Sequence, residues 1–381
     1  MKKIILLSLF IFSCSEKNDM EYSPRNQDFP MKVTFSPTAV KSTDGKVNLV
    51  YSVEILKVDT AGFMMKDFRV FDPANDKVLC TIADTNKYLL IQKPANPPVP
   101  PEKFWYPLVD MHSSYRITIC LVLDPAYIPQ KLSHKLILVK NGQETVYTGA
   151  ETKVSWNQPM VIAPPLRGTG WAATLTTSIL PLNHHIAIQV SYKGNTTVPE
   201  RYCVDWQKCN ETGDRWHDDW AIKENWYCYG NHVFSATDGT VALAMDGMPD
   251  QSPVGSVSPG LSLFNGTGNC VVVFKEGLYI VYAHLIPGSV RVKTGDSVKA
   301  GDTIGQLGNS GNSVAPHLHF GVHSEFPYYI SEGLPYYFNV FVKTGILALS
   351  GPEIIYIPLP VPEQHANEIA ENFGVYTFGN R

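Results

Sequence analysis

Residues 279–323 read "YIVYAHLIPGSVRVKTGDSVKAGDTIGQLGNSGNSVAPHLHFGVH" and carry the strongest structural signal in the chain. Short apolar runs are separated by turns rich in glycine, aspartate and proline, which is typical of antiparallel strands rather than helices. Because side chains alternate along a strand, "PHLHF" would point His317 and His319 to the same face, about 7 Å apart. The stretch therefore predicts a β-sheet that carries two imidazoles on one face.

The remainder of the chain supports the same fold class. Its 381 residues are enough for about two domains, and 44% of them are hydrophobic. Residues 31–155 contain short alternating runs divided by turn residues, which predicts a β-sandwich of immunoglobulin-like type. We therefore expect an all-β protein with an N-terminal immunoglobulin-like β-sandwich and a C-terminal antiparallel β-sheet domain. A net charge of -4 gives no sign of a nucleic-acid partner.

Composition also predicts where the segments begin and end. Prolines and glycines interrupt the strand pattern around "NQPMVIAPPLRGTGW", which indicates a linker between two domains. One short helix is expected near residues 363–373, within an otherwise extended C-terminal segment. The predicted order is a signal peptide at 1–14, a polar tether at 15–30, the sandwich at 31–155, a linker at 156–180, the second domain at 181–345 and a C-terminal tail at 346–381.

The first residues, "MKKIILLSLFIFSC", indicate export. Two lysines precede an apolar run that is too short to span a bilayer, which needs about 20 apolar residues. The small residue Ser13 before Cys14 resembles the lipobox of bacterial lipoproteins. That resemblance implies lipidation of Cys14, a membrane anchor and an extracytoplasmic protein; a plain signal peptide cut nearby is the alternative. In that compartment the six other cysteines can form disulfides, with Cys203 and Cys228 as one candidate pair.

Histidines gather in the predicted second domain at residues 181–345, which holds eight of the eleven. His284 ends the apolar run "YIVYAHL", and Asp205 lies in "RYCVDW". A catalytic zinc ion takes three nitrogen or oxygen ligands and keeps one position for water. His319, Asp205 and one further histidine meet that requirement. His317 and His284 are then available to orient or deprotonate the water.

The motifs of residues 279–322 resemble the catalytic core of the lysostaphin-type zinc endopeptidases. The shared order is Tyr-Ala-His-Leu, a Gly-Asp turn, an Ile-Gly step, a Gly-rich loop and His-Leu-His-Phe. The resemblance covers roughly residues 181–345. In that family the second histidine of the pair binds zinc and the first is catalytic, which implies His319 as ligand and His317 as base. It also implies a catalytic His284, a Zn²⁺ cofactor and peptidoglycan cross-links or stem peptides as substrate.

The chain departs from the family pattern at one ligand. The family usually places a histidine four residues before the aspartate, but this position is Arg201, which has no lone pair to offer a metal. The segment "PLNHHIAIQ" resembles a branch of the family with a histidine pair well upstream of the aspartate. That resemblance implies His185 as the displaced ligand, with His184 and His217 as open alternatives.

Two other classes of function remain open from the sequence. The arginine at the ligand position also fits a catalytically inactive relative that binds cell-wall peptides or regulates an amidase. A third hypothesis is an adhesive or scaffolding lipoprotein whose sandwich is the active part. The turns of residues 293–305 also occur in biotin and lipoyl carriers, but neither Lys293 nor Lys299 lies in the hairpin that a carrier needs. The sequence contains neither a His-Glu-x-x-His helix nor a Gly-x-Ser-x-Gly elbow.

Overall fold

The computed structural model of the chain describes residues 31–55, 64–83, 91–92, 115–176, 184–192, 195–256, 260–262, 264–350 and 353–379. Strands dominate these ranges, so the predicted all-β class with antiparallel sheets is confirmed. The predicted signal peptide, the tether and Cys14 lie outside the described residues. Within the described ranges, no helix combines the length and the hydropathy that a bilayer crossing requires.

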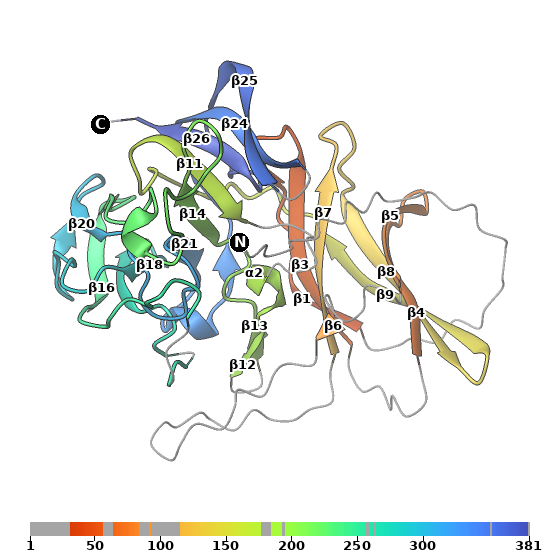
Figure 1. Cartoon of the computed structure of the whole chain (residues 1–381). Helices are drawn as coiled ribbons and strands as arrows, with labels where there is room; N and C mark the ends of the chain where they lie inside the picture. The colour runs from red at the N-terminus through yellow and green to blue at the C-terminus, as the bar shows by residue number, and fades with distance from the viewer. Residues whose placement is uncertain are drawn as a thin grey trace.

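Two antiparallel sheets form the N-terminal part, on the right of Figure 1. We call them the N-terminal sheets. Leu49 and Ile119 of one sheet share a buried cluster with Phe68 and Leu136 of the other, so the two sheets enclose a common core. The first sheet has the order β1-β3-β7-β6 with β2 beside β3, and the second β5-β4-β8-β9. Their bounds are β1 (Met31–Phe35), β2 (Val40–Lys41), β3 (Val47–Ile55), β4 (Met64–Asp72), β5 (Lys77–Ala83), β6 (Ile91–Gln92), β7 (Tyr115–Leu123), β8 (Lys131–Lys140) and β9 (Gln143–Lys153).

An eleven-stranded antiparallel sheet, the large sheet, forms the other part of the molecule (Figure 1). Its order is β19-β16-β17-β18-β21-β14-β11-β26-β24-β25, with β22 beside β21. The buried rings of Trp206, Tyr282 and Phe320 contribute to its core. Its strands are β11 (Gly168–Leu175), β14 (Val204–Lys208), β16 (Gly239–Met245), β17 (Asn269–Lys275), β18 (Leu278–Leu285), β19 (Ser297–Val298), β21 (Leu318–His323), β22 (Gly333–Leu334), β24 (Phe341–Ser350), β25 (Glu353–His365) and β26 (Gly374–Phe378).

Smaller elements surround the large sheet. Three two-stranded pairs join β10 to β23, β12 to β13 and β15 to β20, and the first of these pairs is parallel. Their bounds are β10 (Met160–Ile162), β12 (Val190–Tyr192), β13 (Asn195–Thr197), β15 (His232–Phe234), β20 (Thr303–Gln306) and β23 (Tyr336–Phe338). The described helices are α2 (His184–Ala187), η2 (Lys223–Asn225) and η3 (Tyr328–Ile330).

The C-terminal residues differ from their predicted form. Instead of an extended tail, β24, β25 and β26 extend the large sheet, and β26 pairs with β11, a strand inside the predicted linker. Aromatic packing explains the docking, because the ring of Trp206 lies 5.2 Å from that of Phe378 and 5.9 Å from that of Tyr376. The helix expected near residues 363–373 is absent from this described segment, which completes β25 and then turns. Prolines in "PLPVP" fit the outermost strand, where a missing N–H costs no ladder bond.

Candidate metal centre

Three neighbouring strands of the large sheet bring the site together. The register places Asp205 of β14 opposite His319 of β21, and Ala283 of β18 opposite the same histidine from the other side. His284 follows directly at the end of β18, where its backbone adopts a φ of 64°. A positive φ is costly for a residue with a side chain, and such strain gathers at functional sites. The sheet thus aligns residues that are far apart in the sequence.

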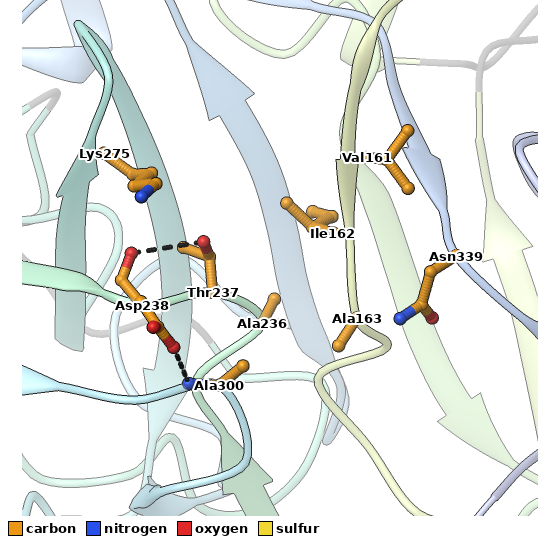
Figure 2. A pocket seen from close by; sticks show the side chains of 9 residues that line it. All are labelled: Val161, Ile162, Ala163, Ala236, Thr237, Asp238, Lys275, Ala300 and Asn339. Atoms are coloured by element: carbon orange, nitrogen blue, oxygen red, sulfur yellow. Dashed lines mark hydrogen bonds between the residues drawn. The ribbon is translucent and has the colours of Figure 1, made fainter.

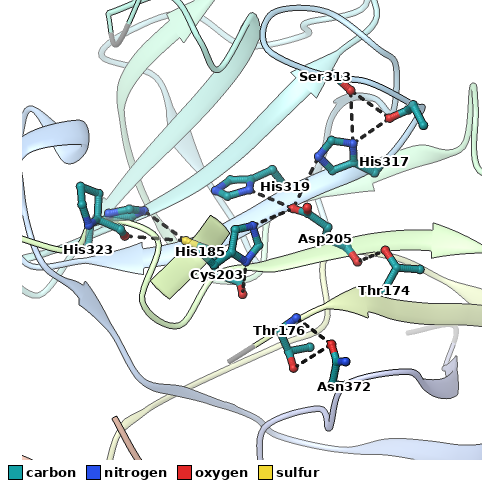
Figure 3. Close-up of polar contacts among 12 residues, drawn as sticks. Thr174, Thr176, His185, Cys203, Asp205, Ser313, His317, His319, His323 and Asn372 are labelled. Carbon is teal, nitrogen blue, oxygen red and sulfur yellow. Dashed lines mark hydrogen bonds and ion pairs between the residues drawn. The ribbon is translucent and has the colours of Figure 1, made fainter. Parts of the chain in front are cut away.

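The carboxylate of Asp205 lies at the centre of the cluster (Figure 3). Its Oδ1 atom is 2.9 Å from Nδ1 of His319, 3.3 Å from Nε2 of His185 and 3.5 Å from Nε2 of His317. His185 comes from α2, and its side chain is completely buried. His317 is the most accessible of the three imidazoles, with 12% of its side chain exposed. The ring of His284 lies 4.6 Å from that of His317 and completes the group.

Backbone carbonyls fix the orientation of three rings. Nδ1 of His185 donates to the carbonyl of Cys203 (3.1 Å), Nδ1 of His284 to Ser310 (2.8 Å) and Nδ1 of His317 to Ala315 (2.8 Å). A neutral imidazole that donates through Nδ1 carries its lone pair on Nε2. The Nε2 atoms of His185 and His317 are also the atoms that face Asp205. Metal-binding histidines are usually held in this way, by a hydrogen bond from the other ring nitrogen.

Among the described residues, two overlapping sets could hold a metal ion. One contains His185, Asp205 and His319, and the other His284, His317 and His319; within each set the ligand atoms lie within 4.8 Å of one another. Imidazole nitrogens and carboxylate oxygens are ordinary zinc ligands, and three of them leave one position for water. The residues therefore fit a catalytic zinc ion.

The protonation of the site suits this chemistry. Burial on its own would raise the pKa of the Asp205 carboxyl, but the surrounding imidazoles, that of His317 first, outweigh it and hold that pKa well below its ordinary value. Burial lowers the pKa of His317 and, more strongly, that of His284. The aspartate is therefore kept ionised, while these two imidazoles are kept neutral.

The Gly-rich loop has no room for a side chain at Gly311. Gly311 has a φ of 75°, and a Cβ there would collide with the backbone of Gly266 and Gly268. The neighbouring residue Ser310 supplies the carbonyl that orients His284, and its hydroxyl donates to the carbonyl of Leu285 (2.7 Å). The serine therefore shapes the site through its position in the loop.

Cys203 has a role that sequence reasoning missed. Cys203 and Cys228, the predicted disulfide pair, are separate thiols, because Cys228 donates to the carbonyl of Pro316 (3.1 Å) in another part of the core. The Cys203 carbonyl orients His185, and its thiol lies 3.9 Å from Nε2 of His323. A Cβ at position 321 would collide with the Cys203 sulfur, so "HFGVH" needs its glycine there. The sequence shows the glycine but not its contact with Cys203.

The other proposed ligands are placed as follows. The His217 imidazole is half exposed, bonds Asp218 at 2.9 Å and joins neither metal-binding set of the described residues. The side chain of His184 lies outside the described residues. Arg201, at the usual ligand position, is completely buried and pairs with Glu332 at 2.8 Å.

A separate hollow of about 240 Å³ lies beside strand β10 (Figure 2). Its wall includes Lys275, Asn339 and the turn at Asp238, whose carboxylate accepts a hydrogen bond from the backbone N–H of Ala300 (2.9 Å). None of the histidines around Asp205 lines this hollow, so it is distinct from the candidate metal centre.

Comparison with known proteins finds similarity over part of the chain. Residues 226–328 match the family model described as peptidase family M23. Over 80 residues the chain is 40% identical to an uncharacterized metalloprotease of Buchnera aphidicola subsp. Baizongia pistaciae, covering 20% of this chain and 21% of that protein. Over 65 residues it is 42% identical to lysostaphin of Staphylococcus simulans, covering 17% of this chain and 13% of that protein.

The chain thus spans about a fifth or less of the length of these relatives. Among solved structures, the catalytic domain of lysostaphin from Staphylococcus simulans is 24% identical and has a TM-score of 0.21, covering 32% of this chain and 86% of that one. The segment that matches the family model contains His284, His317 and His319, whereas His185 and Asp205 precede it.

Proposed function

We propose that this chain, which carries a segment of peptidase family M23, is a zinc-dependent endopeptidase that hydrolyses peptide bonds in peptidoglycan cross-links or stem peptides. The observation that carries the proposal is the convergence on Asp205 of three imidazole nitrogens, two of them fixed by a backbone carbonyl on the far side of the ring.

We assign the zinc ion to His185, Asp205 and His319. The alternative set of His284, His317 and His319 contains no carboxylate, whereas the chosen set uses Asp205, the residue on which the imidazoles converge. The assignment also leaves His317, the more exposed imidazole, free to act on a water molecule. In this proposal His185 takes the place of the displaced histidine ligand.

The remaining histidines serve as proton acceptors. When bound, zinc polarises the scissile carbonyl and lowers the pKa of a water molecule to about 7. The neutral His317 offers its Nε2 lone pair as a general base, while its Nδ1–H bond to Ala315 keeps the ring in place. The protonated ring can then return that proton to the leaving amine. His284 offers Nε2 in the same way, and we assign it to holding the water in line.

Several features of the whole chain belong to the same proposal. The lysines, the apolar run and the Ser-Cys step at residues 1–14 support export and a lipid anchor on Cys14. An anchor there would hold the enzyme outside the cytoplasm, facing the cell wall. We propose that residues 31–155 form an immunoglobulin-like sandwich that acts as a spacer or docks the enzyme.

Digestion of purified peptidoglycan tests the activity. The zinc-loaded full chain should release peptide fragments that mass analysis can identify, and removal of zinc should stop the release. His317→Ala should keep its zinc and lose at least about 100-fold in rate, because a general base contributes that much. His217→Ala, at an exposed histidine, is the matched control and should cleave normally.

The competing hypothesis is an inactive relative that binds cell-wall peptides, which the arginine at position 201 favours. A zinc-loaded chain that binds peptidoglycan but releases no fragment would support that hypothesis and refute the peptidase.

A further inference from the structure

The segment that carries His185 lies between the two parts of the molecule. In Figure 1, α2 occupies the space between the large sheet and strand β3. Helix α2 has only four residues, and a single helical turn is not stable without packing against neighbours. The position of His185 therefore depends on what the adjoining residues contact.

Apolar contacts join the neighbours of His185 and Cys203 to the N-terminal sheets. Ile186 and Tyr202 are each 3% exposed and share one buried cluster with Val40, Val50 and Cys120. The last three residues belong to β2, β3 and β7. Ile186 is the residue after His185, and Tyr202 precedes Cys203, whose carbonyl orients the same histidine.

Polar contacts join the same two parts. The buried guanidinium of Arg201 donates to the Ser52 hydroxyl (3.1 Å) and to the Glu332 carboxylate (2.8 Å). Arg116 of β7 donates to the carbonyl of Thr196, the middle residue of β13. A buried cation requires its partners, since an uncompensated charge in the interior is strongly unfavourable. Arg201, which cannot bind the metal, thus anchors the strand that leads to Asp205.

The two faces of strand β3 contact different parts of the molecule. Leu49, Tyr51 and Val53 point into the core enclosed by the N-terminal sheets. Val50 and Ser52 point the other way, toward Tyr202 and Arg201. Because strand side chains alternate, a substitution at an even or an odd position of β3 tests one face without the other.

We propose that the N-terminal sheets are a structural part of the metal centre, and that Val50 and Ser52 of β3 are positioning residues for His185. The inference rests on the proposed function, in which His185 is the third zinc ligand. Loss of the contacts at Val50 and Ser52 frees α2 and the turn before β14, so His185 no longer stays in register with Asp205 and His319.

Zinc affinity of the full chain tests the inference, measured by competition with a chromophoric chelator. Val50→Ala combined with Ser52→Ala should weaken zinc binding by about tenfold or more, the effect typical of losing an outer contact to a metal ligand. The same variant should alter the visible absorption spectrum of the cobalt-substituted protein. Val53→Ala, on the opposite face of the strand, is the matched control and should leave affinity and spectrum unchanged in the folded protein.

A double-mutant comparison shows whether the strand acts through His185. In a His185→Ala background, the substitutions at Val50 and Ser52 should cause no further loss of zinc affinity, because residues that act as a unit are not additive. An equal loss in both backgrounds, or wild-type affinity in the Val50 and Ser52 variant, would overturn the inference. A wild-type chain that binds neither zinc nor cobalt would instead refute the proposed function itself.

Discussion

At the scale of single residues, the position of each imidazole proton determines what the site can do. Hydrogen bonds from Nδ1 to backbone carbonyls leave Nε2 of His185, His284 and His317 as lone-pair donors. For His185 that lone pair faces Asp205 directly, at 3.3 Å. In the proposed assignment, similar residues take different roles, as ligand or base, according to where the backbone holds them.

The assignment of His185 as third ligand gives a direct prediction. His185→Ala should lower the zinc content of the purified chain and its affinity by at least about tenfold, since a coordinating atom is removed. His217→Ala should retain full zinc, because its ring is half exposed and bonded to Asp218. Both contents can be measured by elemental analysis after dialysis. Full zinc in the first variant together with loss in the second would transfer the assignment to His217.

Part of the site could be predicted from residue types alone. The alternation of "PHLHF" and the end of "YIVYAHL" identified His317, His319 and His284 as members of one cluster, and they lie together. The contribution of Cys203 could not be predicted, because it depends on a main-chain carbonyl and on the missing Cβ of Gly321. Neither property is visible in a pattern of side-chain types, and the cysteine was instead expected to form a disulfide.

At the scale of elements, strand pairing creates the site. Strands β14 and β21 are neighbours although Asp205 and His319 are 114 positions apart. Alternating apolar residues predict that such strands exist, but they do not say which strands pair or in what register.

The pairing of the C-terminal strands could not be predicted for the same reason. Their prolines suggested a tail, whereas docking of Tyr376 and Phe378 against Trp206 makes them part of the large sheet.

Strand β8 provides a prediction about pH. Burial lowers the pKa of His134 to about 4, and its ring donates to the Ala150 carbonyl and accepts a bond from Tyr51. The unfolded chain takes up this proton near pH 6.5 and the folded chain only near pH 4. This residue's contribution to stability is therefore complete above pH 6.5 and is lost as pH falls toward 4, by about 3 kcal/mol.

Urea denaturation at several pH values measures the effect. His134→Gln keeps hydrogen-bonding groups but cannot titrate, so its free energy of unfolding should fall less between pH 7 and pH 4 than that of the wild type. Parallel pH profiles for the two proteins would show that His134 does not carry the effect.

At the scale of the whole molecule, the N-terminal sheets and the large sheet share a buried boundary. The hydroxyl of Thr43 bonds the hydroxyl of Tyr376 (2.7 Å), and the backbone N–H of Lys41 donates to the hydroxyl of Tyr337 (3.0 Å). The run "KVNLVYSVEIL" predicted β3 as a strand, yet it could not show that both faces are covered. Which surfaces meet depends on the folded shapes of both parts, and these shapes involve the entire chain.

The zinc content of the purified full chain tests the central claim most directly. After incubation with zinc and removal of the excess, elemental analysis should find about one zinc per wild-type chain, and that zinc should be lost in both Asp205→Ala and His319→Ala. A wild-type chain that retains no zinc, or an Asp205→Ala variant that retains all of it, would contradict the account.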